Sequence, residues 1–159
     1  MTTNRVLDKF GASTAFTITL ASLATGAAAA RQSDMVDISS LKEQYARLFI
    51  KLKQGTPTGN RQAYIYLLLG DGHATPHRTD GAGASDAALT IINAPLIGTL
   101  KNLPSPSAGE NLYGEFLVRI AAPSFGIAIS HDTASNLDST AGNHWARYIL
   151  LGPDVQAAA

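Results

Sequence analysis

The 159-residue chain contains no cysteine, which excludes disulfide bonds, thiolate metal sites and thiol nucleophiles. Charged residues make up only 15% of the chain, against roughly 25% in typical soluble domains. The net charge is zero, so bulk charge does not indicate a nucleic-acid or membrane-surface partner. No apolar run reaches the roughly 18 residues of a membrane-spanning helix. A free monomer usually carries more surface charge, so this composition favours a protein whose surface is largely covered by neighbouring molecules.

The clearest pattern lies between residues 44 and 70, where two segments alternate with a period of two. In residues 47–53, leucine and isoleucine alternate with arginine, phenylalanine and lysine. Residues 63–69 are apolar on both sides, which is typical of a strand covered on both faces. The glycine- and proline-containing segment 55–60 separates them and has the composition of a turn. The period of two predicts a pair of β-strands joined by this turn.

Short strand-like segments follow one another along the rest of the chain. We predict strands at residues 14–20, 31–38, 96–100, 112–120, 125–130 and 145–151, and a strand or helix at 86–93. No helical period between them indicates parallel βαβ units. We therefore predict an all-β, single-domain antiparallel β-sandwich, a jelly roll of about eight strands, with an immunoglobulin-like sandwich as the alternative. The predicted core comprises Leu48, Ile50, Ile65, Leu67, Phe116, Val118, Ile127 and Ile129.

The two ends of the chain differ in composition from the predicted sandwich, residues 14–152. Residues 1–13 are mostly polar and predict an N-terminal arm, and residues 153–159 predict a C-terminal tail. The Gly152-Pro153 pair is expected to end the last strand. Polar termini normally fray, so we predict that a neighbouring subunit holds the arm.

A secretory signal is the alternative interpretation of the first residues. Arg5 and Lys9 precede an apolar run over residues 11–23, and alanines follow at 27–30, which matches the order of a signal peptide with a small-residue cleavage site. The run alternates with threonines, however, and this alternation favours a strand.

Candidate metal ligands gather in the glycine-rich segment 70–85. His73 and His77 have a His-x3-His spacing, and Asp71 and Asp80 lie in the same segment. In zinc sites this spacing usually lies on a helix or is completed by cysteines. Neither condition applies here, so we predict a loop that faces solvent or a partner, with no metal and no cofactor.

The sequence offers little for catalysis. His131-Asp132 could serve in acid–base chemistry, but an exposed histidine beside a turn-entry aspartate explains the pair equally well. No serine has the strained-turn context of a hydrolase, and there is no phosphate-binding or dinucleotide-binding motif. We interpret Arg47, Lys51 and Lys53 as a basic stripe without interleaved stacking aromatics, which favours a solvated strand face over a nucleic-acid site. We therefore predict that the protein is not an enzyme.

A series of short segments carries a resemblance that spans residues 14 to 150. In chain order the segments are Ile18–Gly26, Arg31–Ser33, Met35–Asp37, Gly55–Pro57, Ala63–Tyr66, Ser85–Ala88, Leu96–Thr99, Gly126–Ile127, His131–Asp132 and Gly142–Asn143. Their order resembles a family of small virion structural proteins encoded by tailed bacteriophages and prophages. The resemblance implies a virion context without a mechanism.

With the resemblance, the sequence predicts a non-enzymatic virion structural protein. We expect a capsid decoration or cement protein, made in the host cytoplasm, that stabilises a phage head as a homo-oligomer. Its predicted partners are the major capsid protein and copies of itself, with no direct contact to nucleic acid or membrane. The predicted contact residues are Arg5, Phe10, His73, His77 and Arg78.

The alternative function is a sugar- or receptor-binding module of a phage tail or fibre. Such a module would need exposed tryptophan or tyrosine side chains beside carboxylates. Trp145 lies in an apolar segment and is predicted to belong to the core. Tyr64 and Tyr66 are the remaining candidates if their strand face is exposed.

Overall fold

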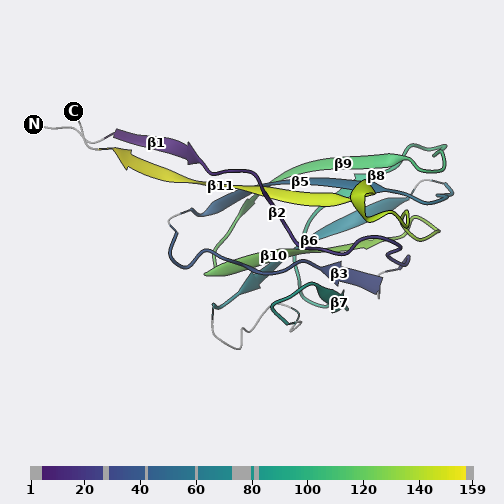
Figure 1. Ribbon diagram of the computed structural model, residues 1–159, viewed down its shortest axis with the longest axis horizontal. Helices are drawn as coiled ribbons and strands as arrows, with labels where there is room; N and C mark the ends of the chain where they lie inside the picture. Colours follow the sequence, from purple (N-terminus) through teal and green to yellow (C-terminus); the bar gives the residue numbers. More distant parts are fainter. Residues whose placement is uncertain are drawn as a thin grey trace, which may run out of the picture.

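The computed structural model describes residues 5–26, 29–41, 43–59, 61–72, 80 and 83–156, which form two antiparallel β-sheets (Figure 1). Sheet A has the strand order β1-β11-β5-β9, with β2 also paired to β11; sheet B has the order β7-β3-β10-β6-β8, with β4 also paired to β10. The strands are β1 (Arg5–Phe10), β2 (Thr14–Ala15), β3 (Ala30–Gln32), β4 (Val36–Asp37), β5 (Tyr45–Lys53), β6 (Gln62–Gly70), β7 (Ala87–Leu89), β8 (Leu96–Lys101), β9 (Asn111–Arg119), β10 (Ser124–His131) and β11 (Trp145–Gln156).

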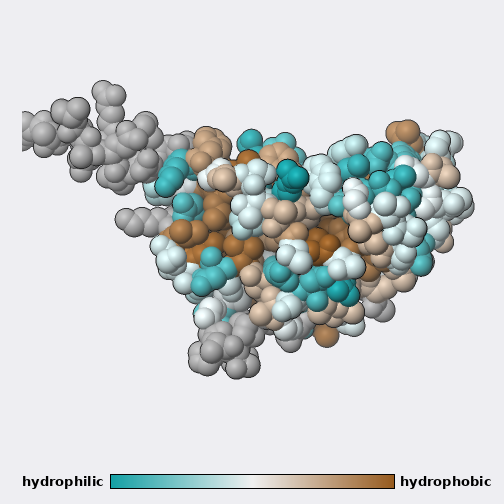
Figure 2. All heavy atoms as spheres, in the orientation of Figure 1, coloured by the Kyte–Doolittle hydropathy of each residue, from teal (hydrophilic) through white to brown (hydrophobic). Residues whose placement is uncertain are grey.

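The described residues contain no α-helix, and a turn of 3-10 helix, Ala141–Asn143, precedes β11. The predicted all-β, antiparallel class is therefore confirmed. Figure 2 faces an edge of the sandwich, where apolar patches lie between the strands of sheet A and those of sheet B. The segment that leads from β2 toward β3 packs along the core, since Phe16 and Leu20 are both buried.

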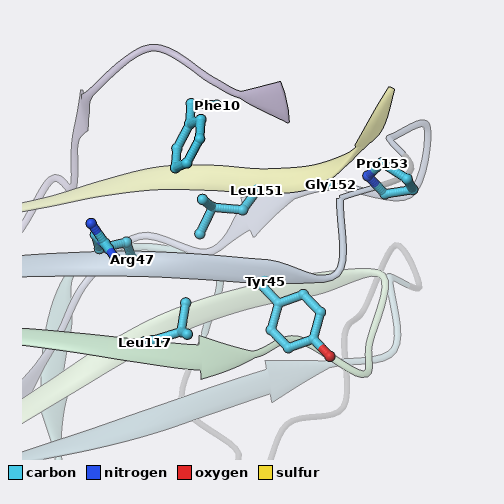
Figure 3. A pocket seen from close by; sticks show the side chains of 7 residues that line it. All are labelled: Phe10, Tyr45, Arg47, Leu117, Leu151, Gly152 and Pro153. Carbon is cyan, nitrogen blue, oxygen red and sulfur yellow. The ribbon is translucent and has the colours of Figure 1, made fainter. Parts of the chain in front are cut away.

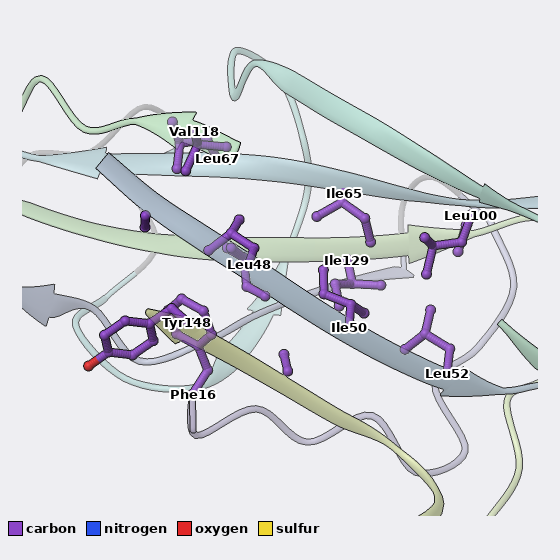
Figure 4. Packing of buried hydrophobic residues seen from close by; sticks show 14 of the residues in the cluster. Phe16, Leu48, Ile50, Leu52, Ile65, Leu67, Leu100, Val118, Ile129 and Tyr148 are labelled. Atoms are coloured by element: carbon purple, nitrogen blue, oxygen red, sulfur yellow. The ribbon is translucent and has the colours of Figure 1, made fainter. Parts of the chain in front are cut away.

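The core lies between the two sheets and is built by the predicted alternation (Figure 4). Leu48 and Ile50 of β5 face Ile65 of β6 and Ile129 of β10, and all four are almost inaccessible to solvent. All the predicted core residues are buried except Phe116, which is partly exposed and packs against the cluster. An aromatic group at one end joins Phe125 edge-to-face to Phe16 and Tyr148, at ring-centroid distances of 5.8 and 5.4 Å.

Phe116 is partly exposed because it lies where the edges of the two sheets meet. Its ring packs over Gly98 of β8 and lies close to Gly114 of β9, where a β-carbon would collide with neighbouring side chains. The two glycines thus allow the edge strands β8 and β9 to approach each other.

A second apolar cluster covers the outer face of sheet B. Leu68 of β6 and Ala128 of β10 pack there against Leu89 and Ala94, which follow the glycine-rich segment. Asp80 holds this covering segment in place, because its carboxylate accepts backbone N–H bonds from residues 92–94 at 2.7 to 3.0 Å. The central part of β6 is therefore covered on both faces, as its apolar sequence predicts.

Several predicted strands are shorter in the structure. Only Thr14–Ala15 of the segment 14–20 pairs in a sheet. The segment 31–38 splits into β3 and β4 because Ser33, between them, pairs with Ile127 differently: its Oγ accepts the Ile127 N–H at 3.0 Å and its own N–H donates to the Ile127 carbonyl at 2.8 Å. The strand alternative is correct for residues 87–89 of the segment 86–93.

The chain ends form a two-stranded ribbon that the sequence does not predict. β11 does not stop at Gly152-Pro153 but continues to Gln156, antiparallel to β1, from the pair Phe10↔Leu151 to the pair Arg5↔Gln156. Beyond Leu151, β11 is paired only with β1, so one edge is free of ladder bonds and tolerates a proline. The arm therefore has a partner within its own chain, contrary to the expectation that only a neighbour would order it. Figure 1 shows the ribbon extending away from the sandwich.

Candidate functional site: the outer face of sheet A

The predicted contact residues are not gathered at one place that the structure describes. Phe10 ends β1 and is 63% exposed. Arg5 begins the same strand, but its side chain lies outside the described part of the structure. His73, His77 and Arg78 also lie outside the described residues, so their role stays a prediction.

Exposed apolar side chains concentrate instead on the outer face of sheet A. Of the eight large hydrophobic residues that are exposed within the described part of the chain, four belong to this sheet: Phe10 (63%), Tyr45 (43%), Tyr113 (65%) and Leu117 (64%). The strand period places Tyr45, Tyr113 and Leu117 on the sheet face that points away from the core. Such a concentration is typical of an interaction surface.

An apolar groove crosses this face at the base of the ribbon (Figure 3). The register aligns Phe10, Leu151 and Tyr45 on three adjacent strands, and Arg47 pairs with Leu117 one step further along. The groove has a volume of about 350 Å³ and is lined by Phe10, Tyr45, Arg47, Leu117, Leu151, Gly152 and Pro153.

A second, aromatic hollow lies at the other end of the same face. Trp145, Lys51 and Tyr113 occupy one cross-strand row, and the hollow of about 330 Å³ is lined by Phe49, Ile50, Tyr113, Gly114, Glu115 and Trp145. Trp145 is partly exposed, so its predicted place in the core is wrong. The Arg147 guanidinium lies 5.7 Å from the Trp145 ring centroid, within the range of a cation–π contact.

Cationic side chains outnumber carboxylates on this face. Over β5, β9 and residues 145–153, the outward positions include Arg47, Lys51, Lys53, Arg119 and Arg147, against the single carboxylate of Glu115. Two of the cations are paired: Arg47 Nε lies 3.2 Å from Glu115 Oε1, and Lys53 Nζ lies 3.5 Å from Asp138 Oδ2. The premise that aromatics do not interleave with the basic stripe is also wrong, because Phe49, Tyr113 and Trp145 lie among these cations.

Asp138 anchors the loop beside this face. The Asn143 side-chain amide donates to Oδ1 at 2.8 Å and the Thr140 N–H donates to it at 2.9 Å. These hydrogen bonds, with the nearby Lys53 ammonium, lower the pKa of Asp138 to about 2. The carboxylate therefore stays ionised at neutral pH and holds the loop against the end of β5.

His131 is a buried structural residue, whereas the sequence suggests an exposed one. It is fully buried, with Nε2 2.8 Å from the Leu23 carbonyl oxygen and Nδ1 2.9 Å from Thr133 Oγ1. The carbonyl can only accept, which assigns the neutral ring a proton on Nε2. Asp132 is also engaged, because it accepts the Gln62 N–H at 2.8 Å and the Tyr64 hydroxyl at 3.2 Å.

We expect stability to fall as the pH drops below about 6.5, because of His131. Burial lowers the pKa of His131, outweighing the Leu23 hydrogen bond and the Asp132 charge, and His144 lowers it further. A histidine with a depressed pKa stabilises the fold above its unfolded pKa of about 6.5, and this stabilisation is lost as pH falls toward the folded pKa. The loss should approach 1.4 kcal/mol per pH unit at most.

Urea unfolding at pH 7.5, 6.5 and 5.5 measures this dependence. The free energy of unfolding of the His131→Gln variant should depend less on pH, because the glutamine amide can still donate to the Leu23 carbonyl but does not titrate. The same pH dependence in the variant and in the unchanged chain would assign it to another group. Asp138 and Asp86, whose pKa values are lowered, make the stability depend on pH only below about pH 4, outside this window.

The other sequence candidates do not form a site within the described residues. Among these residues no three histidine, aspartate or glutamate side chains are placed to hold a metal ion. Both carboxylate oxygens of Asp80 accept backbone hydrogen bonds, while His73 and His77 lie outside the described part. Tyr64 and Tyr66 are half-buried rather than open. In the same part of the chain, no helix is long and apolar enough to cross a membrane.

No protein-family model and no curated protein matches the chain. The resemblance to phage virion proteins therefore stays a prediction. Apart from Phe10, the residues that line the groove and the hollow were not predicted as a site, because each site draws on several strands. One signal was present: in the segment 111–119, alternate positions carry tyrosine, glutamate, leucine and arginine.

Proposed function

We propose that the sandwich is a jelly roll, a topology supported by its strand order. If β1 and β2 count as one strand, β3 and β4 as another, and the short β7 is set aside, eight strands remain. Their pairs are first with eighth, second with seventh, third with sixth and fourth with fifth. A long antiparallel hairpin that wraps into two sheets has these pairs, which is the arrangement of a jelly roll.

We propose that the protein is a non-enzymatic structural protein of a phage virion that decorates the capsid surface. The observation that carries this proposal is the exposed apolar groove at the base of the ribbon, lined by Phe10, Tyr45, Leu117 and Leu151. Large apolar side chains gathered on one sheet face favour burial against a partner. The low charge content of the chain also suits a protein with much of its surface in contact.

The charge on this face favours an acidic partner surface over a second copy docked face to face. Arg47 lines the groove, and Arg119 pairs with Tyr45 in the register. Two such faces brought together would oppose like charges, which is unfavourable. The proposed partner is the major capsid protein, contacted through an acidic and apolar surface, while copies of the chain meet elsewhere. Binding only to the assembled shell would stabilise it by mass action.

Removing two groove side chains should weaken attachment by at least about tenfold. Phe10 and Leu117 are both more than half exposed, so the Phe10→Ala, Leu117→Ala double variant should fold. Each substitution removes apolar area that the partner would cover. A loss of about 1.4 kcal/mol in binding free energy corresponds to a tenfold loss in affinity. The measurement is co-sedimentation with purified heads that lack this protein.

The matched control is the double variant Ile92→Ala, Leu103→Ala, which removes two exposed apolar side chains away from the groove. Its binding should not change. Attachment that is equally strong in the groove variant would contradict the proposed contact face. Quantitative mass spectrometry of virions that found only a handful of copies, or labelling confined to the tail, would overturn the capsid role.

A further inference from the structure

The aromatic hollow holds the only tryptophan of the chain and has the features of a small-molecule site. β11 supplies Trp145, β5 supplies Phe49, and β9 supplies Tyr113 and Glu115. Three neighbouring strands therefore hold the lining side chains on a rigid sheet rather than on a loop. Its volume of about 330 Å³ lies at the lower end of the range for ligand pockets, roughly 300–1,000 Å³, which suits one or two sugar rings.

The hollow and the groove of the proposed capsid contact share no lining residue, although Glu115 of the hollow and Arg47 of the groove form an ion pair at 3.2 Å. Tyr45 lines the groove, and Lys51 lies in the same cross-strand row as Trp145 and Tyr113. Six residues of extended strand separate the two positions, about 20 Å. The Trp145 end of the hollow is therefore distant from Tyr45, and the inference does not depend on a virion role.

The lining combines the rings of Phe49, Tyr113 and Trp145 with the carboxylate of Glu115, and two cationic side chains lie beside it. Aromatic rings offer the C–H faces of a pyranose a flat apolar surface, while carboxylate and cationic side chains can hydrogen-bond its hydroxyl groups. Lys51 lies in the register between Trp145 and Tyr113, and the Arg147 guanidinium lies beside the Trp145 ring. Neither cation has an ion-pair partner among those found in the described residues, so both are suitably placed for an anionic group.

We propose that this hollow binds an acidic saccharide, a pyranose that carries a carboxylate, such as a uronic acid unit. The ring packs on Trp145 and Tyr113, and the sugar carboxylate lies toward Lys51 and Arg147. Glu115, held by Arg47 at 3.2 Å, accepts hydrogen bonds from sugar hydroxyls.

Single-stranded nucleic acid fits the same hollow less well. A nucleic-acid groove normally tracks the phosphate backbone with a continuous line of free cations. Here Arg47 and Lys53 are engaged by carboxylates, so the two cations beside the hollow without an ion pair among those found in the described residues, Lys51 and Arg147, suit a single carboxylate rather than a run of phosphates.

The single tryptophan makes its fluorescence a direct reporter of this site. The full chain is titrated with tetrasaccharides of glucuronate, galacturonate and mannuronate, with neutral cellotetraose, and with an eight-nucleotide oligothymidylate. We expect a saturable change in emission with at least one uronate tetrasaccharide, with an affinity at least about tenfold higher than for cellotetraose. No saturable change with any of the three overturns the proposal, and a change with oligothymidylate alone would assign the hollow to nucleic acid instead.

Variants on the same sheet face identify the residues that bind. Tyr113→Ala removes a largely exposed ring without touching the reporter and should weaken uronate binding at least about tenfold. Tyr45→Ala, the matched control outside the hollow, should leave binding unchanged. Lys51→Gln should remove the preference for uronate over the neutral sugar. Unchanged binding in Tyr113→Ala, or an equal loss in Tyr45→Ala, would contradict the proposed site.

Discussion

Replacing Ile65 with alanine is expected to lower the free energy of unfolding by about 2–5 kcal/mol. Ile65 is completely buried near the middle of β6, with Ile129 of β10 as its cross-strand partner on one side and Gly98 of β8 on the other. The substitution loses the transfer free energy of the removed carbons, and a cavity remains because the paired strands cannot collapse onto it. Urea unfolding measures the change, with the same m-value, the dependence of the free energy of unfolding on urea concentration, used for both proteins.

The control for this substitution is Ile92→Ala, which removes the same atoms from a side chain that is 75% exposed. Its effect should stay within about 0.5 kcal/mol, as for most surface substitutions. A loss of less than about 1 kcal/mol for Ile65→Ala would mean that the space between the sheets is not packed around this position.

The strands that build the core could be predicted because their burial follows the period of two. β5 alternates strictly between buried and more exposed residues, and Ile65 and Leu67 of β6 point into the same core. The strand β1 could not be predicted, because its sequence does not alternate with a period of two and its partner is at the other end of the chain. Strand formation there depends on tertiary pairing more than on propensity, and the same pairing carries β11 through Pro153.

The candidate site was harder to predict than the core, because it depends on register between distant strands. Trp145 lies in an apolar sequence, which suggested burial, yet its strand is covered on one face only. Lys51 and Tyr113 become its neighbours only through the pairing of β11 with β5 and of β5 with β9. A shift of one residue would turn each of these side chains to the other face. Sequence alone does not provide that register.

Residues that carry the family resemblance have structural roles here. Asp86 accepts hydrogen bonds from Arg31 Nε and from the N–H and hydroxyl of Thr19. Burial raises the pKa of Asp86, but these hydrogen bonds outweigh it and hold the pKa below its ordinary value. Asp86 thereby fastens the segment before β7 to β3 and to the chain after β2. Residues of this kind preserve a fold, and their contacts indicate no mechanism.

The ribbon of β1 and β11 can be removed to test attachment without removing residues of the core. Residues 145–151 of β11 pair with β5 and belong to the sandwich, whereas residues 152–156 pair only with β1. An isolated two-stranded ribbon is marginally stable in water. Removal of β1 should therefore release residues 152–156 without opening the core, and it also removes Phe10 from the groove.

We expect a chain that begins at Gly11, after an initiating methionine, to fold but to lose attachment to phage heads. Hydrogen exchange should show loss of protection at residues 152–156, because an unpaired terminal strand frays, with protection of β5 and β10 retained. Attachment should weaken by more than the roughly tenfold expected for the groove variant, because the deletion removes both an anchor and the ribbon. A chain that lacks only residues 1–4 keeps every pair from Arg5↔Gln156 to Phe10↔Leu151 and is the matched control. Retained attachment by the chain that begins at Gly11 would show that neither the ribbon nor Phe10 is needed to contact the shell. Lost protection in β5 would show that β1 stabilises the sandwich itself.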